Sequence, residues 1–145
     1  VHDLHRLVME ADLARSFAPE YVNGKGQLSD ILCKMIERGQ MVTAVDYNNA
    51  VARMSEYYHA FDKLFEEHDA IITPAVPGEA PVGLESTGSP MFCTIWTYFG
   101  MPAITLPLLQ GDNGLPLGVQ LVGPRGDDAR LLRTARWLVD TVAGS

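Results

Sequence analysis

The sequence has little positive charge and no long apolar run. Lysine and arginine together number 11 against 18 aspartates and glutamates, which gives a formal net charge of −7. Nucleic acids and anionic membrane surfaces are bound through clustered Lys and Arg, so we expect neither as a partner. Each apolar stretch is interrupted by Pro, Gly or a charged residue well short of the ~20 residues that cross a bilayer.

Cysteine is also scarce. Cys33 and Cys93 are far apart in the sequence, and both lie in predicted helices. Two distant thiols are more typical of a reducing cytoplasm than of a disulfide scaffold. We therefore expect a cytoplasmic protein with two buried thiols, although a bridge between them stays open. Residues 1–6 already alternate polar and apolar side chains, which is not the pattern of a secretory signal.

Metal-ligand patterns are nearly absent. His2 and His5 are three residues apart at a predicted helix start, where both could reach one ion, and Asp3 lies between them. Closed metal sites need three or four ligands of fixed geometry. We therefore expect no metal site.

The first part of the chain, residues 1–68, has the periodicity of helices. Residues 3–17 predict an amphipathic helix, and residues 23–26 a loop. A second helix begins near Ser29 and ends at Gly39. The longest helix runs from 43 to about 68, because Thr43 is a suitable N-cap and Asp46 favours the first turn.

Residues 69–145 predict strands, loops and helices. We expect a strand over 70–73 that Pro74 ends, a long Pro- and Gly-rich loop over 75–90, a short helix over 91–98, strands over 103–106 and 117–121 with a turn-rich loop between them, and a last helix from Asp127 or Asp128 to Val142. The helix at 91 would have Ser89 as N-cap and Pro90 as its first residue.

The last helix has a clear apolar stripe. The predicted buried face is Leu131, Leu132, Ala135, Leu138, Val139 and Val142, and the predicted solvent face is Arg130, Arg133 and Arg136. The elements together predict an α/β fold in which helices pack on a small mixed sheet of about three strands. We expect one domain over residues 1–145, mainly helical over 1–68. So narrow a sheet leaves unpaired edges, which favours self-association with another copy.

Several runs of residues resemble a known family. They are Asp69-Ala70-Ile71-Ile72-Thr73-Pro74, Ala80-Pro81, Gly100-Met101-Pro102-Ala103, Leu106-Pro107, Gly114-Leu115-Pro116-Leu117-Gly118-Val119-Gln120-Leu121-Val122-Gly123 and Leu131-Leu132. Their order and spacing resemble the C-terminal part of amidase signature enzymes, which hydrolyse carboxamides. The resemblance extends from about Ile31 to the end of the chain.

The resemblance implies a catalytic apparatus that these residues do not contain. Family members use a nucleophilic Ser, a second Ser and a Lys that acts as base, in a Gly/Ser-rich segment upstream of the matched region. No Gly-Gly-Ser-Ser-like run occurs here, and the loop 85–90 is better explained as a helix approach. We therefore expect no catalytic residue in this chain, no cofactor, and no activity of the chain alone.

The resemblance also suggests where substrate would lie. The aromatic segment 92–99 corresponds to a region near the acyl pocket, and such a pocket would favour an aryl or hydrophobic acyl group. Thr73 and Trp96 are the predicted substrate-facing residues. Residues 97–100 read Thr-Tyr-Phe-Gly where a smaller Asn-x-Ala-Gly-like run is frequent, which weighs against members acting on glutaminyl-tRNA.

Three hypotheses follow. The chain is the C-terminal portion of an amidase signature hydrolase and supplies scaffold and pocket wall for a small-molecule amide. Alternatively, it is a non-catalytic binding or assembly module. The third hypothesis is a subunit that completes a split amidase with a partner chain.

Overall fold

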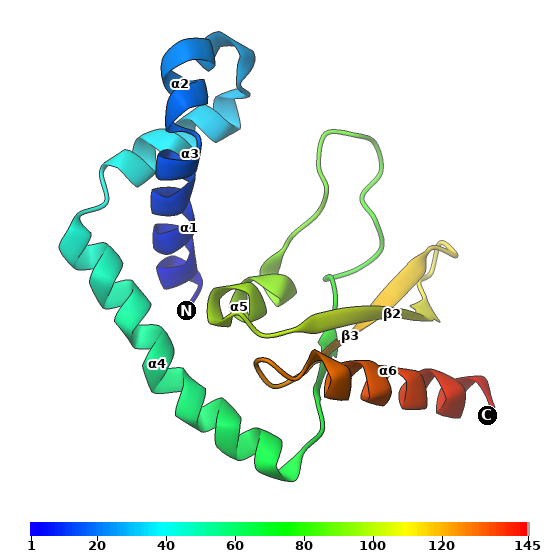
Figure 1. Ribbon diagram of the computed structural model, residues 1–145. Helices are drawn as coiled ribbons and strands as arrows, with labels where there is room; N and C mark the ends of the chain where they lie inside the picture. Colours follow the sequence, from blue (N-terminus) through cyan, green and yellow to red (C-terminus); the bar gives the residue numbers. More distant parts are fainter. Residues whose placement is uncertain (145) are drawn as a thin grey trace. The chain divides into compact units, whose positions relative to one another are not determined.

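The computed structural model describes residues 1–144 (Figure 1). These residues form two compact units, residues 1–56 and residues 57–144. The first unit contains α1 (His2–Ser16), α2 (Ala18–Gly24), the 3-10 turn η1 (Lys25–Gln27), α3 (Asp30–Gln40) and the first part of α4 (Ala44–Glu67). The second unit contains the end of α4, then β1 (Ile71–Pro74), α5 (Met91–Phe99), β2 (Ala103–Gln110), β3 (Pro116–Val122) and α6 (Asp128–Ala143).

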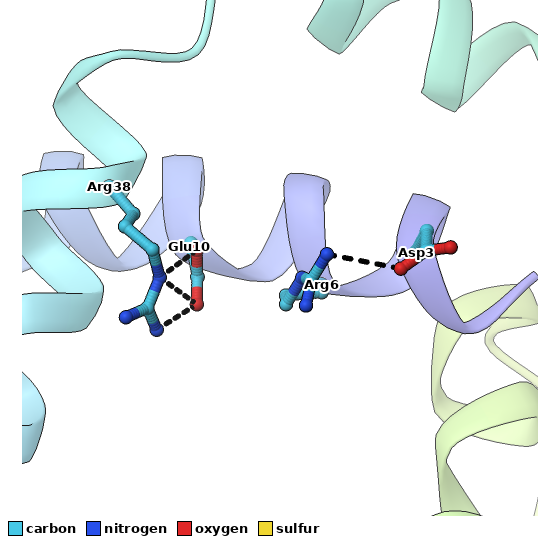
Figure 2. Close-up of polar contacts among 4 residues, drawn as sticks. All are labelled: Asp3, Arg6, Glu10 and Arg38. Carbon is cyan, nitrogen blue, oxygen red and sulfur yellow. Dashed lines mark hydrogen bonds and ion pairs between the residues drawn. The ribbon is translucent and has the colours of Figure 1, made fainter.

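Close packing of α1 on α3 organises the first unit. A Cβ on Gly39 would lie 1.9 Å from the Glu10 carbonyl oxygen and 2.9 Å from the Ala14 Cβ, so the helices touch backbone to backbone at this point. Beside the contact, Arg38 Nε donates to both Glu10 carboxylate oxygens at 3.0 Å, as Figure 2 shows. Glu10 is buried, and the forked guanidinium compensates its charge.

The predicted loop over residues 23–26 is wrong, because helix α2 and the turn η1 occupy this stretch. Pro19 pre-organises the first turn of α2. The end of the helix is held by Asn23 Nδ2, which donates to the Pro19 carbonyl at 2.9 Å, and by Lys25 Nζ, which donates to Glu37 at 2.8 Å. Helix α3 begins next to Ser29, as predicted, and Ser29 Oγ caps it by accepting from Leu32 N. Thr43 Oγ1 likewise accepts from Asp46 N.

The three strands form a sheet of order β1-β3-β2, and every pairing is antiparallel. The α/β class is thus confirmed, but the sheet is not mixed. A tight turn joins β2 to β3, and short connections produce antiparallel pairs. Gly114 holds this turn with a φ of +81°, a conformation that glycine adopts without strain. β2 shifts register between Leu106 and Leu109, beside Pro107, which cannot donate to the ladder.

Helix α6 covers one face of the sheet (Figure 1). Its buried stripe is narrower than predicted, because Leu132 is 58% exposed and Val142 is 46% exposed. Leu131 and Ala135 are buried against Leu106 and Leu121, and Leu138 and Val139 pack beside them. Asp127 caps the helix by accepting from Arg130 N.

Arg130 was predicted to lie on the solvent face of α6, and this prediction is wrong. Its guanidinium lies against the end of α4, where it donates to the carbonyls of Phe65 and His68 at 3.1 and 3.2 Å and to Asp69 at 3.1 Å. The last carbonyls of a helix have no partner within the helix. Arg130 supplies hydrogen-bond donors to these carbonyls, and the contact joins α6 to the residues that lead into β1.

The N-cap of helix α5 lies one residue later than predicted. Pro90, not Ser89, is the N-cap, and its carbonyl accepts from Cys93 N and Thr94 N at 2.9 and 3.0 Å. The helix ends at Gly100 in the left-handed conformation. Met101 N then donates to the Trp96 carbonyl at 3.0 Å, an arrangement that reverses the chain into β2.

Candidate functional site

The sheet has one apolar and one polar face. Alternate residues of a strand point to opposite sides, so Leu121 and Leu106 face α6 while Gln120 points the other way. The register places Thr73 of β1 and Thr105 of β2 directly beside Gln120 of β3. We call the side that carries Thr73, Thr105 and Gln120 the polar face.

A chain of hydrogen bonds links the polar face to α5. Thr73 Oγ1 lies 3.2 Å from Gln120 Oε1, and Gln120 Nε2 lies 3.5 Å from Cys93 Sγ. Cys93 Sγ in turn lies 3.6 Å from the Ala75 carbonyl oxygen. Gln120 is only 3% exposed, so its amide would be destabilising without these partners. Cys93 is half-buried rather than buried as predicted, and both thiols are free.

Trp96 lies one turn beyond Cys93 on α5, on the same helix face. Its ring meets Phe61 edge-on, with 6.1 Å between centroids. Phe99 anchors the same helix by packing on Tyr57 and Phe61 of α4 at 5.1 and 5.3 Å. The Trp96 indole Nε1 is buried, and among residues 1–144 it has no acceptor. Such a donor is uncommon in folded proteins.

The unpaired indole nitrogen gives a stability prediction. Replacing Trp96 with Phe keeps an aromatic ring against Phe61 and removes the unsatisfied donor, whose burial costs about 1–3 kcal/mol. The loss of ring area opposes this gain, so we expect Trp96→Phe to change the free energy of unfolding by less than about 1 kcal/mol. Urea unfolding measures the change. Trp96→Ala, which also removes the ring, should be the more destabilising of the two variants.

The loop 75–90 between β1 and α5 is held to the β2–β3 turn by Glu79. Its carboxylate accepts from Asn113 N at 2.9 Å, Asn113 Nδ2 at 2.6 Å and Leu115 N at 3.3 Å. These hydrogen bonds, chiefly the one from the Asn113 side chain, lower the pKa of Glu79 below its usual 4.5. The loop joins the strand of Thr73 to the helix of Trp96.

The Glu79 contact should be lost in acid. A carboxylate whose folded pKa is lowered contributes stability above its unfolded pKa, and this contribution disappears as the pH falls through the folded pKa. We expect the backbone amide signals of Asn113 and Leu115 to titrate together in NMR spectra with a midpoint below 4.5. In Glu79→Gln this titration should be absent. A midpoint above 4.5 would show that the hydrogen bonds from Asn113 and Leu115 do not stabilise the Glu79 carboxylate.

A cavity lies on the other side of the sheet, the side that α6 covers. It has a volume of about 660 Å³ and is lined by residues of the α4 end, β1 and α6, including Ile72, Arg133 and Trp137. Neither Thr73 nor Trp96 lines it. Among residues 1–144, no group of three His, Cys, Asp or Glu side chains is arranged to hold a metal ion. Within the same residues, no helix is long and apolar enough to cross a membrane.

Hydrogen bonds link Thr73 to α5, the helix that carries Trp96. The path from Thr73 to α5 runs through Gln120 and Cys93, which sequence reasoning did not assign to the site. A usable signal existed for Gln120, because it is the one amide side chain in the apolar run of residues 117–122. Nothing in the sequence places Cys93 beside it.

Residues 10–132 match the family model described as Amidase. A fatty acid amide hydrolase of Medicago truncatula is 29% identical over 90% of this chain and 24% of its own length. One subunit of the glutamyl-tRNA(Gln) amidotransferase of Halothermothrix orenii is 33% identical over 52% of this chain and 17% of its own length. The chain therefore spans about a quarter or less of these relatives.

Solved structures agree in fold. One described as an amidase superposes with a TM-score of 0.79 at 24% identity and covers 96% of this chain and 35% of its own. A bacterial aryl acylamidase of the amidase signature family superposes with a TM-score of 0.67 at 14% identity, covering 89% and 31%. The family match over most of the chain and the shared fold lead to one conclusion: this chain belongs to the amidase family.

Proposed function

We propose that this chain is the C-terminal portion of an amide hydrolase, which converts a carboxamide to a carboxylate and ammonia or an amine. The chain would supply scaffold and one wall of the acyl pocket. The nucleophilic Ser, the second Ser and the Lys would come from sequence outside these 145 residues, so the chain alone should not turn over amides. Support comes from the family match and from the small share of each relative that the chain spans.

The family match is the observation that carries this proposal, and the hydrogen-bonded polar face next to α5 supports the choice of substrate-facing residues. In this proposal Thr73 and Trp96 face the substrate. Thr73 is half-buried at the end of the chain of hydrogen bonds, and the buried Trp96 N–H lacks an acceptor among residues 1–144. An amide carbonyl is a suitable acceptor for an indole N–H, and aromatic side chains suit an aryl or other apolar acyl group.

Benzamide tests this assignment on the chain itself. The protein has two tryptophans, and each gives its own indole N–H signal in an NMR spectrum. Titration with millimolar benzamide should shift the Trp96 indole signal and the Thr73 amide signal. The Trp137 indole, which lines the cavity beside α6, is the internal control and should not move. Shifts confined to Trp137 would contradict the proposal, and so would the absence of any shift.

A second candidate is one component of a split amidase. It is favoured by the relatives whose names describe one subunit of an amidotransferase. It is also favoured by the outer edges of β1 and β2, which among residues 1–144 have no strand beside them and could pair with a partner or with a second copy. Purification from the native source distinguishes the two, because a separate, larger polypeptide should copurify only in the split arrangement.

Two further features belong to this proposal. We place the protein in the cytoplasm, because its two cysteines are free and far apart in sequence. We also propose that the two compact units act as one domain of the complete enzyme.

A further inference from the structure

The Ala75 carbonyl fixes the direction of the hydrogen bonds on the polar face. A carbonyl oxygen only accepts, and this one lies 3.6 Å from Cys93 Sγ. Ala75 is 5% exposed, and its N–H is already used, since it donates to the Gly118 carbonyl at 3.0 Å. The single hydrogen of the Cys93 thiol is therefore directed at the Ala75 carbonyl.

The direction of the thiol hydrogen bond sets the direction of the next two hydrogen bonds. With its hydrogen committed, Cys93 Sγ can only accept from Gln120, so the Gln120 amide must turn its NH₂ group toward the sulfur at 3.5 Å. This leaves Gln120 Oε1 facing Thr73 at 3.2 Å. An amide oxygen has no hydrogen to give, and the Thr73 hydroxyl must donate.

Thr73 is the last residue in this series of hydrogen bonds. Its hydroxyl has one hydrogen and two lone pairs, and the hydrogen is held by Gln120. The side chain is half-buried, whereas Gln120 is buried. A ligand that reaches this position meets a hydroxyl that can accept but cannot donate.

We infer that Gln120 is a positioning residue that holds the Thr73 hydroxyl as a hydrogen-bond acceptor toward the ligand. The polar face thereby favours a ligand that brings an N–H, such as a carboxamide, over an ester of similar shape. This inference rests on the proposed function, because it takes Thr73 as a substrate-facing residue.

The orientation of Gln120 is tested first, without any ligand. In NMR spectra of the 145-residue chain, the Gln120 side-chain NH₂ protons should show nuclear Overhauser effects to the Cys93 β-protons and not to the Thr73 methyl group. In Cys93→Ser the pattern should persist, because a hydroxyl can also donate to Ala75 and accept from Gln120. The reverse pattern, with the NH₂ group next to the Thr73 methyl, would overturn the inference and leave the proposed function standing.

The ligand preference is tested with benzamide and methyl benzoate, which differ in the N–H. The measured quantity is the ratio of their dissociation constants. In Gln120→Leu the hydroxyl of Thr73 is free to rotate and donate, and the preference for benzamide should fall about fivefold, the effect of one hydrogen bond. Thr73→Val should lose the preference to the same extent, and Thr73→Ser should keep it.

A double-variant cycle separates positioning from general damage. Once Thr73 is Val, adding Gln120→Leu should change the benzamide to methyl benzoate ratio no further. A further fall would mean that Gln120 acts independently of Thr73 and would overturn the inference. An unchanged ratio in Gln120→Leu alone would overturn it as well. A wild-type chain that binds neither probe would contradict the proposed function, and the ligand preference with it.

Discussion

Replacing Gly39 with Ala should destabilise the unit formed by residues 1–56 by about 2–3 kcal/mol, at the upper part of the range for overpacked cores. The added methyl group would lie 1.9 Å from the Glu10 carbonyl oxygen and 2.5 Å from its carbon. These are backbone atoms of α1, which cannot move aside like the end of a flexible side chain. Helices α1 and α3 would have to separate, and the Arg38–Glu10 contacts at 3.0 Å would lengthen.

The control for this change is Gly26→Ala. No atom lies within 4 Å of a Cβ built at Gly26, so a methyl group there meets open space, and the free energy of unfolding should change by less than about 1 kcal/mol. Native-state hydrogen exchange of the α1 and α3 amides measures both variants. Equal protection in Gly39→Ala and Gly26→Ala would show that the two helices are not in backbone contact.

Replacing Leu121 with Ala should cost about 2–5 kcal/mol, the range for truncating a fully buried leucine. Leu121 is 1% exposed and lies in the cluster with Leu106, Leu131 and Ala135 that holds α6 on the sheet. Its neighbour in the strand is Gln120, so loosening of β3 should also weaken the hydrogen bonds of the polar face. Urea unfolding, followed by tryptophan fluorescence, measures the loss.

Leu132→Ala is the matched control. Leu132 follows the buried Leu131 on α6 but is 58% exposed, so its truncation should change the stability by less than about 0.5 kcal/mol. A cost for Leu132→Ala as large as that for Leu121→Ala would mean that α6 packs with the wider stripe that its sequence predicts.

The sequence predicted the elements of this fold better than their contacts. Proline and glycine mark the ends of β1, β2 and β3. The helix starts near Ser29 and Asp127 and the cap at Thr43 were predicted, because each depends on local hydrogen bonds. The buried stripe of α6 was predicted too wide, because periodicity shows which residues are apolar and not how much of the helix the sheet covers. Arg130 was misplaced because its acceptors, the carbonyls that end α4, are more than sixty residues away.

The site was predictable only in part, for the same reason. Thr73 and Trp96 came from the family resemblance, and their role stays a prediction. The side chains between them were missed, because Gln120 meets Thr73 across 47 residues and Cys93 across 27 residues of sequence. Gly39 was taken for a helix end, whereas its lack of a side chain serves the contact with α1.

The central claim is that this chain builds part of an amide hydrolase without carrying its nucleophile. Incubation of the highly purified 145-residue protein with an anilide, followed by measurement of released aniline, tests it most directly. We expect no release above the rate in buffer, although benzamide shifts the Trp96 indole signal in the same preparation. Aniline release that follows the 15.9 kDa chain through successive columns, and scales with its concentration, would contradict the claim and place a complete catalytic site within these residues.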